Sequence, residues 1–433
     1  MTSANRAERL AEGRSLRSQI PRSAHARWSA DGRDPLAIVR SEDEGRLPEL
    51  VSVRHKRMSA SPFAYYRGGA ALMATDLARS PATPIGVQLG GDCHLLNFGG
   101  YATPERNLVF DVNDFDETLR GPWEWDLKRL SVSVVLAARE IGMRPPAAQE
   151  TVAQTVRTYR ERMNLFAQLT PLDIWYSRID ASALTGRPQN AEQLIPKITA
   201  IVDGRRRFVD NPPFIYHSPD GDPLEERTRA RVSAYRRHLR TEVCELFDRY
   251  RFVDAAIKVV GIGSVGTRCA VALFTTPDDE PLMLQVKEAR RSVLEPFLSP
   301  SPFKNQGERI VAGQREMQAA SDIFLGWLRD DAGHDFYVQQ LRDMKVSVKI
   351  DTLRPTHLVQ YAEACAWALA RAHARTGDGA AISGYLGASD RFDRALVRFA
   401  SDYADQVERD YEAFRKAFAV IEERPSTPNK PPG

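Results

Sequence analysis

Residues 85–130 constrain the fold most strongly, because short strand-like runs alternate there with turns rich in polar side chains. Residues 98–101 and 108–112 indicate two strands, and the turn sequence TPERN between them predicts that they pair as a hairpin. A hairpin at this place would hold Asp92 and Asp114 near one edge and leave their side chains free. The stretch therefore predicts a site rich in oxygen ligands, of the kind that binds phosphate and metal.

A helix is expected directly after Pro122, since apolar residues recur there at helical spacing. Asp126 falls in the first turn of this helix, where the helix N-terminus stabilises a carboxylate. Further helices are predicted from Ser61-Pro62, over residues 69–77, through most of 145–250, and over 305–328, 358–373 and 389–421.

The composition excludes several classes of protein. A chain of 433 residues can bury two cores. Its net charge of only +3 argues against a protein that mainly coats nucleic acid or an anionic membrane. The Arg-rich runs near residues 205 and 227 are flanked by acidic residues, so we interpret them as solvated helix faces. Four widely spaced cysteines fit reduced thiols, and no apolar run reaches membrane-spanning length. We therefore expect a cytoplasmic protein with neither a membrane nor a specific nucleic acid as partner.

A second region, residues 251–345, has the pattern strand, turn, strand. Its strand-like runs are residues 257–260, 269–274 and 282–286. The sequence GIGSVG between the first two runs supplies Gly261, Gly263 and Gly266. Glycines between two strands, rather than between a strand and a helix, favour a flap over nucleotide phosphates rather than a dinucleotide fold. Lys287 ends the third run, where its ammonium can reach the α and β phosphates.

Phosphoryl transfer needs a carboxylate that orients the attacking hydroxyl, and oxygen donors that hold magnesium against the phosphates. Asp92 and Asn97 have the spacing of a D-x-x-x-x-N catalytic loop, and Asp114 follows the returning strand. Each of these residues alone could equally cap a turn or close a loop. Their occurrence together, with a separate flap and Lys287, favours a phosphate and metal site.

These motifs resemble those of a known superfamily. The segment GDCHLLNFG resembles the GDxHxxN catalytic loop of aminoglycoside and choline phosphotransferases, within the protein-kinase-like superfamily. The segment NDFDETLRGPWEWDL resembles their metal-binding Asp and the downstream Asp-Leu pair. Nearly the whole chain, including VVGIGSVGTRC and LQVKEARRSVLE, further resembles an uncharacterised bacterial family, domain of unknown function 2252. That nearer resemblance brings no established substrate.

The superfamily resemblance implies a role for each matching residue, with ATP and Mg²⁺ as cofactors. Asp92 would be the catalytic base, His94 a loop-stabilising residue and Asp126 a structural anchor. The other implied residues are Gly261, Gly263, Gly266, Lys287 and Glu308 for the nucleotide, and Asn97 and Asp114 for magnesium.

Some assignments stay open at this level. Glu308 is the expected partner of Lys287, but Glu316 on the same predicted helix is an alternative. Asp111 and Asp116 both flank Asp114, and either could share the metal. Two further arginines, Arg57 and Arg67, lie in an otherwise apolar segment, where we expect them to be paired structurally.

The order of the motifs is reversed relative to an ordinary kinase, in which the glycine-rich flap and Lys precede the catalytic loop. The resemblance therefore implies an α+β, two-lobed, protein-kinase-like fold that is circularly permuted. The small lobe would be an antiparallel sheet plus one helix, and the helix ending in ARAHARTG should pack beneath the catalytic loop. The expected divisions are 1–250 for an N-terminal arm and the mainly helical large lobe, 251–345 for the small lobe, 346–421 for helices completing the large lobe, and 422–433 for a disordered tail.

The function expected from these features is ATP- and magnesium-dependent transfer of a phosphoryl group to a hydroxyl. The acceptor, a small molecule or a protein, is not specified by any motif. Two alternatives remain: transfer of an adenylyl group to a protein, and a nucleotide-binding regulatory module without turnover.

Overall fold

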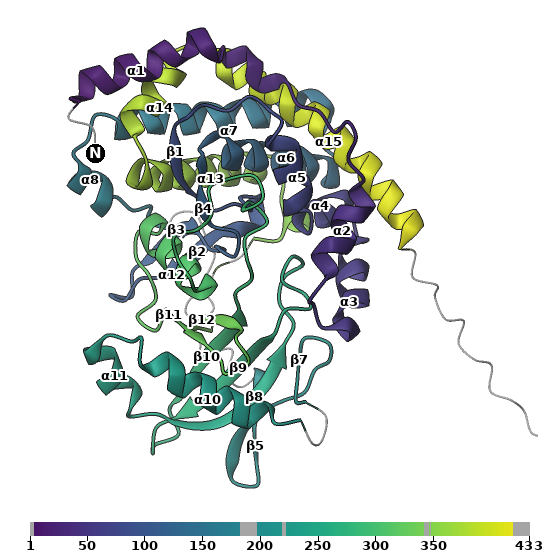
Figure 1. Cartoon of the computed structure of the whole chain (residues 1–433), viewed down its shortest axis with the longest axis vertical. Coiled ribbons are helices and arrows are strands. Elements are labelled where there is room, and N and C mark those ends of the chain that lie inside the picture. Colours follow the sequence, from purple (N-terminus) through teal and green to yellow (C-terminus); the bar gives the residue numbers. More distant parts are fainter. Residues whose placement is uncertain (1–3, 182–196, 219–221, 342–345, 347, 419–433) are drawn as a thin grey trace, which may run out of the picture.

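The computed structural model describes residues 4–181, 197–218, 222–341, 346 and 348–418, and the predicted tail at 422–433 lies outside them. In Figure 1 a group of packed helices forms the upper part of the molecule, and a six-stranded sheet lies below it. The chain therefore has a mixed α+β structure with antiparallel sheets, as its sequence predicts.

Helices build the upper part and enclose its core. Apolar faces of the long helices α6, α7, α13 and α15 pack on one another in that core. Ser61 caps α4 by accepting a hydrogen bond from the backbone N–H of Ala64, so the predicted helix entry is confirmed. The helices of this part are α1 (Arg6–Gln19), α2 (Pro35–Asp43), α3 (Pro48–Met58), α4 (Pro62–Arg67), α5 (Ala70–Leu77), α6 (Glu124–Glu140), α7 (Pro145–Phe166), α8 (Pro171–Tyr176), α13 (Pro355–Thr376), α14 (Gly379–Leu386) and α15 (Arg391–Ala417).

Two short antiparallel sheets lie among these helices. They are formed by β1 (Gly86–Leu89) with β4 (Leu119–Pro122), and by β2 (Phe98–Ala102) with β3 (Leu108–Val112). Phe98 lies opposite Val112, so the predicted hairpin is confirmed. In the sheet of β1 and β4, Leu89 lies opposite Leu119. The segment 90–97, which follows β1, and the segment 113–118, which precedes β4, therefore start from neighbouring positions. This pairing brings Asp92 close to Asp114.

The six-stranded sheet is antiparallel throughout, in the order β11-β12-β10-β9-β8-β7. Lys287 lies near the end of β10, opposite Cys269 on β9 and Tyr337 on β12. The predicted strands 269–274 and 282–286 are therefore confirmed, whereas the first strand begins earlier than the predicted run 257–260 and ends at Lys258. The bounds are β7 (Ile215–Tyr216), β8 (Arg251–Lys258), β9 (Cys269–Thr275), β10 (Pro281–Glu288), β11 (Gly326–Arg329) and β12 (Asp335–Gln340).

Elements from residues 199–250 cover both faces of this sheet. On one face α10 (Leu224–Arg236) and α11 (Thr241–Phe247) bury Tyr235 and Phe247 against sheet residues. On the other face β5 (Thr199–Val202) and β6 (Arg205–Phe208) form a hairpin that buries Phe208. The prediction that 145–250 is mostly helical is wrong over 199–216, where the strands are short and mostly exposed and so lack a clear apolar alternation. All these elements precede residue 251, where the predicted small lobe begins.

The helix predicted over residues 305–328 is shorter than expected. α12 (Gln306–Met317) ends where the side chain of Gln318 and the backbone of Ala319 turn to hydrogen-bond Val112 and Asp111. Phe324, which the predicted helix 305–328 includes, is buried beside the sheet instead. Tertiary contacts at the helix end therefore override the apolar periodicity.

The predicted helix ending in ARAHARTG is α13. The hydroxyl oxygen of Tyr361 on this helix lies 2.9 Å from the carbonyl oxygens of both Leu95 and Phe98, which share its single O–H as acceptors. α13 thus packs against the segment that carries Asp92, as expected.

Candidate functional site

The segment from Gly90 to Asn97 is fixed at its start by Asp126. The two carboxylate oxygens of Asp126, in the first turn of α6, accept hydrogen bonds from the backbone N–H groups of Gly90 at 2.7 Å and Gly91 at 3.0 Å. Gly91 has a φ of +81°, and a Cβ there would lie 2.4 Å from the carbonyl oxygen of Glu117. Only glycine fits this turn, which places Asp92 at its end.

Asp126 is itself held from below. Its Oδ2 lies 3.3 Å from Nε2 of His373 on α13, and Nδ1 of the same ring lies 2.8 Å from the hydroxyl of Tyr159 on α7. All three side chains are buried. The turn before Asp92 therefore rests on a chain of polar contacts that links three long helices.

Arg129 holds the side chain of Asp92. Its Nε and one terminal nitrogen lie 2.6 and 2.5 Å from Oδ1 of Asp92. Burial raises the pKa of Asp92, Arg129 opposes this, and the carboxylates of Asp114 and Glu117 raise it further, to about 7. The side chain keeps 18% exposure. Asp92 is therefore an oriented carboxylate that gains and loses its proton near neutral pH.

His94 and Asn97 complete the segment. Nε2 of His94 lies 3.7 Å from Oδ2 of Asp92, and burial together with Arg67 and Arg129 holds the pKa of this imidazole well below its usual range, so the ring is neutral. The amide nitrogen of Asn97 donates to the carbonyl oxygen of Asp92 at 2.7 Å. This contact uses the amide nitrogen of Asn97 and leaves its side-chain oxygen as an acceptor.

Three aspartates follow on the neighbouring segment, and they have different surroundings. Asp111 is fully buried and paired with Arg371 of α13 at 2.6 Å, so it serves the core. Asp116 accepts hydrogen bonds from the hydroxyls of Ser264 and Tyr337, both at 2.8 Å, and pairs with Lys287. Asp114 accepts from the backbone N–H of Asp116 at 3.2 Å and acts on the pKa of Asp92.

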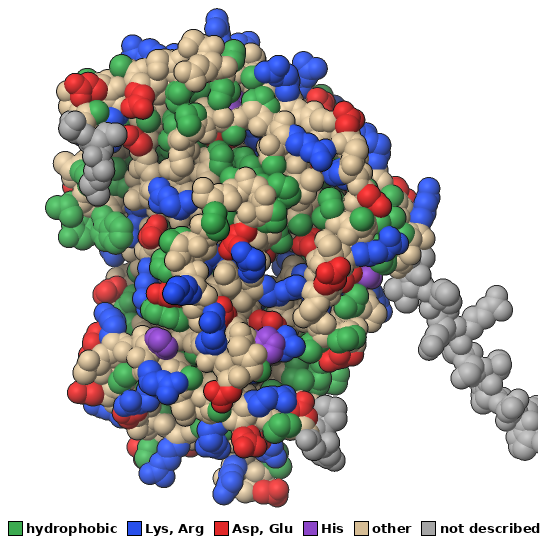
Figure 2. Space-filling view, in the orientation of Figure 1, with side chains coloured by type: hydrophobic (Ala, Val, Ile, Leu, Met, Phe, Trp, Pro, Cys, Tyr) green, Lys and Arg blue, Asp and Glu red, His purple; other side chains and the backbone are tan. Residues whose placement is uncertain are grey.

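Residues from distant parts of the chain meet at Asp116. Lys287 follows it by 171 positions, and its ammonium is close enough to both Asp114 and Asp116 that these carboxylates, chiefly Asp116, outweigh burial and raise its pKa. Ser264 comes from the glycine-rich segment. Figure 2 shows basic and acidic side chains gathered where the helical part meets the sheet part. The structure therefore brings the two predicted halves of the site together.

The expected pairing of Lys287 with a glutamate is not found. Within the described ranges, neither Glu308 nor Glu316 forms an ion pair with Lys287, and Asp116 takes that place. The neighbouring residue Arg309 is the one that α12 directs toward the site. It donates to the carbonyls of Thr118 at 2.6 Å and Asp116 at 2.9 Å, and so holds the aspartate segment against the helix.

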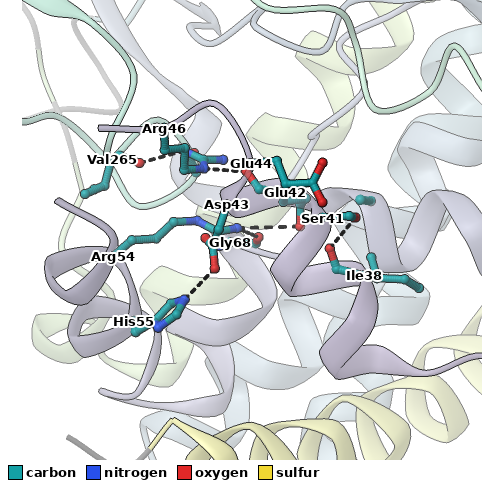
Figure 3. A network of polar contacts seen from close by, with 12 residues as sticks. Ile38, Ser41, Glu42, Asp43, Glu44, Arg46, Arg54, His55, Gly68 and Val265 are labelled. Carbon is teal, nitrogen blue, oxygen red and sulfur yellow. Dashed lines mark hydrogen bonds and ion pairs between the residues drawn. The ribbon is translucent and has the colours of Figure 1, made fainter. Parts of the chain in front are cut away.

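The glycine-rich segment, residues 259–268, is held from outside by the connection between α2 and α3. Arg46 donates to the carbonyls of Val265 at 2.6 Å (Figure 3) and Gly263 at 2.7 Å. Arg57, on α3, donates to the carbonyl of Gly261 at 2.8 Å. Gly266 has a φ of +90°, and a Cβ there would lie 2.9 Å from the side chain of Arg46. These contacts fix the position of the segment whose Ser264 contacts Asp116.

A polar network fixes the α2–α3 connection in turn. Asp43, at the end of α2, lies between Arg54 at 2.6 Å and His55 at 2.7 Å on α3 (Figure 3). Arg54 also donates to the carbonyl of Gly68 at 3.0 Å. The connection above the glycine-rich segment is therefore tied to the residues that follow α4.

Three arginines belong to the site although the sequence did not predict it. Arg129, on the helix turn after Asp126, and Arg46 had no motif to mark them, and Arg67 was expected to have a structural partner. The Nε of Arg67 is buried without a hydrogen-bond partner among the described residues, and Asp92 and Asp114 both act on its charge. An arginine one helical turn beyond an anchoring aspartate is the only signal that could have identified Arg129.

The described ranges contain no group of three or more His, Cys, Asp or Glu side chains arranged to hold a metal ion. Magnesium does not require such a group, because it is bound through one or two protein oxygens together with water and substrate phosphates. The carboxylate of Asp114 and the side-chain oxygen of Asn97 are donors of the kind that magnesium prefers. Asn97 and Asp114 therefore stay the predicted magnesium ligands.

Comparisons with known proteins yield one family. The model of the family described as "Uncharacterized protein conserved in bacteria (DUF2252)" matches residues 46–417. No curated protein and no solved structure matches the chain. Among the described residues, no helix has the length and apolar character needed to cross a membrane.

Proposed function

The chain belongs to the bacterial family DUF2252, and from the geometry of its site we propose that it is an ATP- and magnesium-dependent phosphotransferase. The observation that carries this proposal is the meeting of Lys287 and Ser264 with Asp116, two residues after Asp114. A lysine, a glycine-rich segment and a pair of carboxylates converge in this way where phosphates are held for transfer.

Asp92 is the proposed general base. Its Oδ1 is held by Arg129, so the carboxylate has one orientation, and its pKa of about 7 suits proton transfer at neutral pH. The oxygen of an acceptor hydroxyl attacks the γ-phosphorus, the bond from that phosphorus to the bridging oxygen breaks, and ADP leaves. The proton of the hydroxyl goes to Asp92.

The phosphates would lie between the glycine-rich segment and the aspartates. Lys287 has three N–H donors, so it can contact a phosphate oxygen while its contact with Asp116 is kept or exchanged. Asn97 and Asp114 would hold magnesium, which neutralises charge on the phosphates during transfer. Two arginines act on the protein side: Arg129 fixes the carboxylate of Asp92, and Arg309 fixes the backbone of Asp116.

We also propose that the architecture is kinase-like and circularly permuted. The glycine-rich segment and Lys287 belong to an antiparallel sheet with α12 beside it, whereas Asp92 and Asp114 belong to the helical part. That division of roles corresponds to the two lobes of a kinase, in reversed chain order. The acceptor, a small molecule or a protein, would enter next to Asp92.

Two measurements test the proposed function. The melting temperature of the protein should rise with ATP plus magnesium, and should rise less with ATP alone, because a ligand that binds the folded state stabilises that state. Candidate acceptors, including the protein itself, are then incubated with ATP labelled on either the γ- or the α-phosphate. An acceptor that gains label from the γ-phosphate supports phosphoryl transfer. An acceptor that gains label from the α-phosphate shows adenylyl transfer instead. Nucleotide binding without either label leaves a regulatory module, and no thermal shift with any nucleotide rejects the nucleotide site.

A further inference from the structure

We propose that Arg67 is a ligand of the terminal phosphate of the bound nucleotide. The inference rests on the proposed function and names a residue of the same site that no motif marks. Four observations carry it. The backbone on both sides of Arg67 is hydrogen-bonded, and the residue lies next to the glycine-rich segment. Carboxylates lie near its guanidinium, and its side-chain Nε has no hydrogen-bond partner among the described residues.

The backbone on both sides of Arg67 is fastened to the site. The carbonyl of Tyr66 accepts a hydrogen bond at 2.9 Å from Arg129, the residue that also holds Asp92. The carbonyl of Gly68 accepts one at 3.0 Å from Arg54. The end of α4 therefore has a fixed position beside the base, and Arg67 projects from that end.

Arg67 also lies directly opposite the glycine-rich segment. A Cβ placed on Gly263 would be 3.7 Å from the carbonyl oxygen of Arg67, and that is the nearest atom it would meet. Arg46 binds the carbonyl of the same glycine from the other side. Residue 67 is thus next to the glycine-rich segment, under which the phosphates would lie.

The half-buried side chain of Arg67 differs in its pairing from the buried arginines around the site. Arg54, Arg129 and Arg371 each have a carboxylate within 2.6 Å, whereas none of the described carboxylates forms an ion pair with Arg67. Its Nε is buried without a hydrogen-bond partner among the described residues, a feature that it shares with Arg54 and Arg371. Burial lowers the pKa of Arg67, yet the charges of Asp92, Asp114 and Glu140 oppose that change, and a guanidinium stays protonated in any case.

A half-buried guanidinium that lies near carboxylates but pairs with none of them is available to an anion that enters beside it. Phosphate matches the planar fork of arginine in charge and geometry, and it can accept two parallel N–H bonds. The competing explanation is that Arg67 only offsets the charge of Asp92 and Asp114. That explanation predicts a change in the pKa of Asp92 but no preference among nucleotides with different numbers of phosphates.

The test is calorimetric titration of the full chain with magnesium-ATP, magnesium-ADP and AMP. The variants are Arg67→Gln and Arg67→Lys, with Arg79→Gln as a control, because Arg79 is exposed at the end of α5 and binds only the carbonyl of Asp31. We expect Arg67→Gln to weaken ATP binding by about 10- to 100-fold, the usual worth of hydrogen bonds to a charged group. Binding of ADP and AMP should be unchanged, because neither carries the γ-phosphate, so the preference for ATP over ADP is lost. Arg67→Lys keeps the charge but not the fork, and should fall between.

The outcomes separate the two levels of the proposal. If the unaltered protein binds no nucleotide, the proposed function fails and this inference with it. If the unaltered protein prefers ATP over ADP and both variants keep that preference, the phosphotransferase proposal stands and Arg67 is not a phosphate ligand. A variant whose only change is a shifted pH dependence of transfer shows charge balance and also overturns the inference. Thermal melting shows whether each variant is folded. If Arg67→Gln is unfolded, the nucleotide preference of Arg67→Lys decides the outcome.

Discussion

The two segments that meet at the site are held in very different ways. Residues 90–97 rest on buried contacts from α6 and α13, through Asp126, Arg129 and Tyr361. Residues 259–268 are held by hydrogen bonds from Arg46 and Arg57 to their carbonyls, by one hydroxyl contact to Asp116, and by packing of Val259 and Val265 against Leu50. The first segment lies against the long helices, whereas the second lies mainly against α3 and the connection before it.

This difference fits the tasks that we assign to the segments. A catalytic base must keep its orientation within a narrow range, and contacts that are themselves packed provide that. A segment that covers phosphates must move to admit and release them, and such elements come from the less stable regions of a fold. The contrast therefore predicts large chemical effects from changes at 90–97 and smaller, dynamic effects from changes at 259–268.

The largest effect is expected from Asp92→Asn. The amide has nearly the shape of the carboxylate but cannot take a proton from the acceptor, so phosphoryl transfer should fall by about 10²- to 10⁴-fold. Nucleotide affinity should stay close to that of the unaltered protein, since Asp92 faces the acceptor rather than the nucleotide. Steady-state turnover with parallel calorimetry measures both, and retained turnover would remove Asp92 from the role of base.

The pH dependence of turnover should follow the state of Asp92. Burial and neighbouring carboxylates raise its pKa to about 7, and only the deprotonated form accepts a proton, so turnover should fall as pH drops below about 7. Arg129 opposes that rise, so Arg129→Met should move the decline to higher pH. Arg129→Lys, which keeps a positive charge, should move it less. A decline that stays in place in both variants would contradict the pairing seen here.

The smallest effect is expected from Arg46→Gln, which removes two hydrogen bonds to the glycine-rich segment. Amide hydrogen exchange at Val265 and Thr267 should become about three- to tenfold faster, because the segment opens more often. Exchange at Gly90 and Gly91 should not change. Arg40→Gln, at an exposed position on α2, is the matched control. Equal acceleration in both segments would show that they are not held separately.

Sequence patterns predicted much of this arrangement. The hairpin of β2 and β3, the strands around the glycine-rich sequence and the position of Asp126 in a first helical turn all follow from local spacing and turn residues. The convergence of Lys287 with the aspartate segment was expected only through the resemblance to kinases. No local pattern joins residues 171 positions apart.

The elements that sequence did not predict depend on tertiary contacts. The strands β5 to β7 are short, and β5 and β6 are mostly exposed, so their composition carries little signal. α12 ends early because Gln318 and Ala319 bond to Val112 and Asp111 of β3. The partner of Lys287 is Asp116 rather than Glu308, which spacing along a helix could not decide. Arg46, Arg67 and Arg129 acquire their places only when distant segments fold together.

The central claim is that the two segments act on one ligand, and a double-mutant cycle on magnesium-ATP binding tests it most directly. The variants are Lys287→Met from the sheet part, Asp114→Asn from the helical part, and the double variant, each titrated by calorimetry with and without magnesium. We predict that each single change weakens binding, that Asp114→Asn removes most of the dependence on magnesium, and that the two effects are coupled by about 0.5–3 kcal/mol. Strictly additive effects, or variants that bind as the unaltered protein does, would contradict a shared nucleotide site.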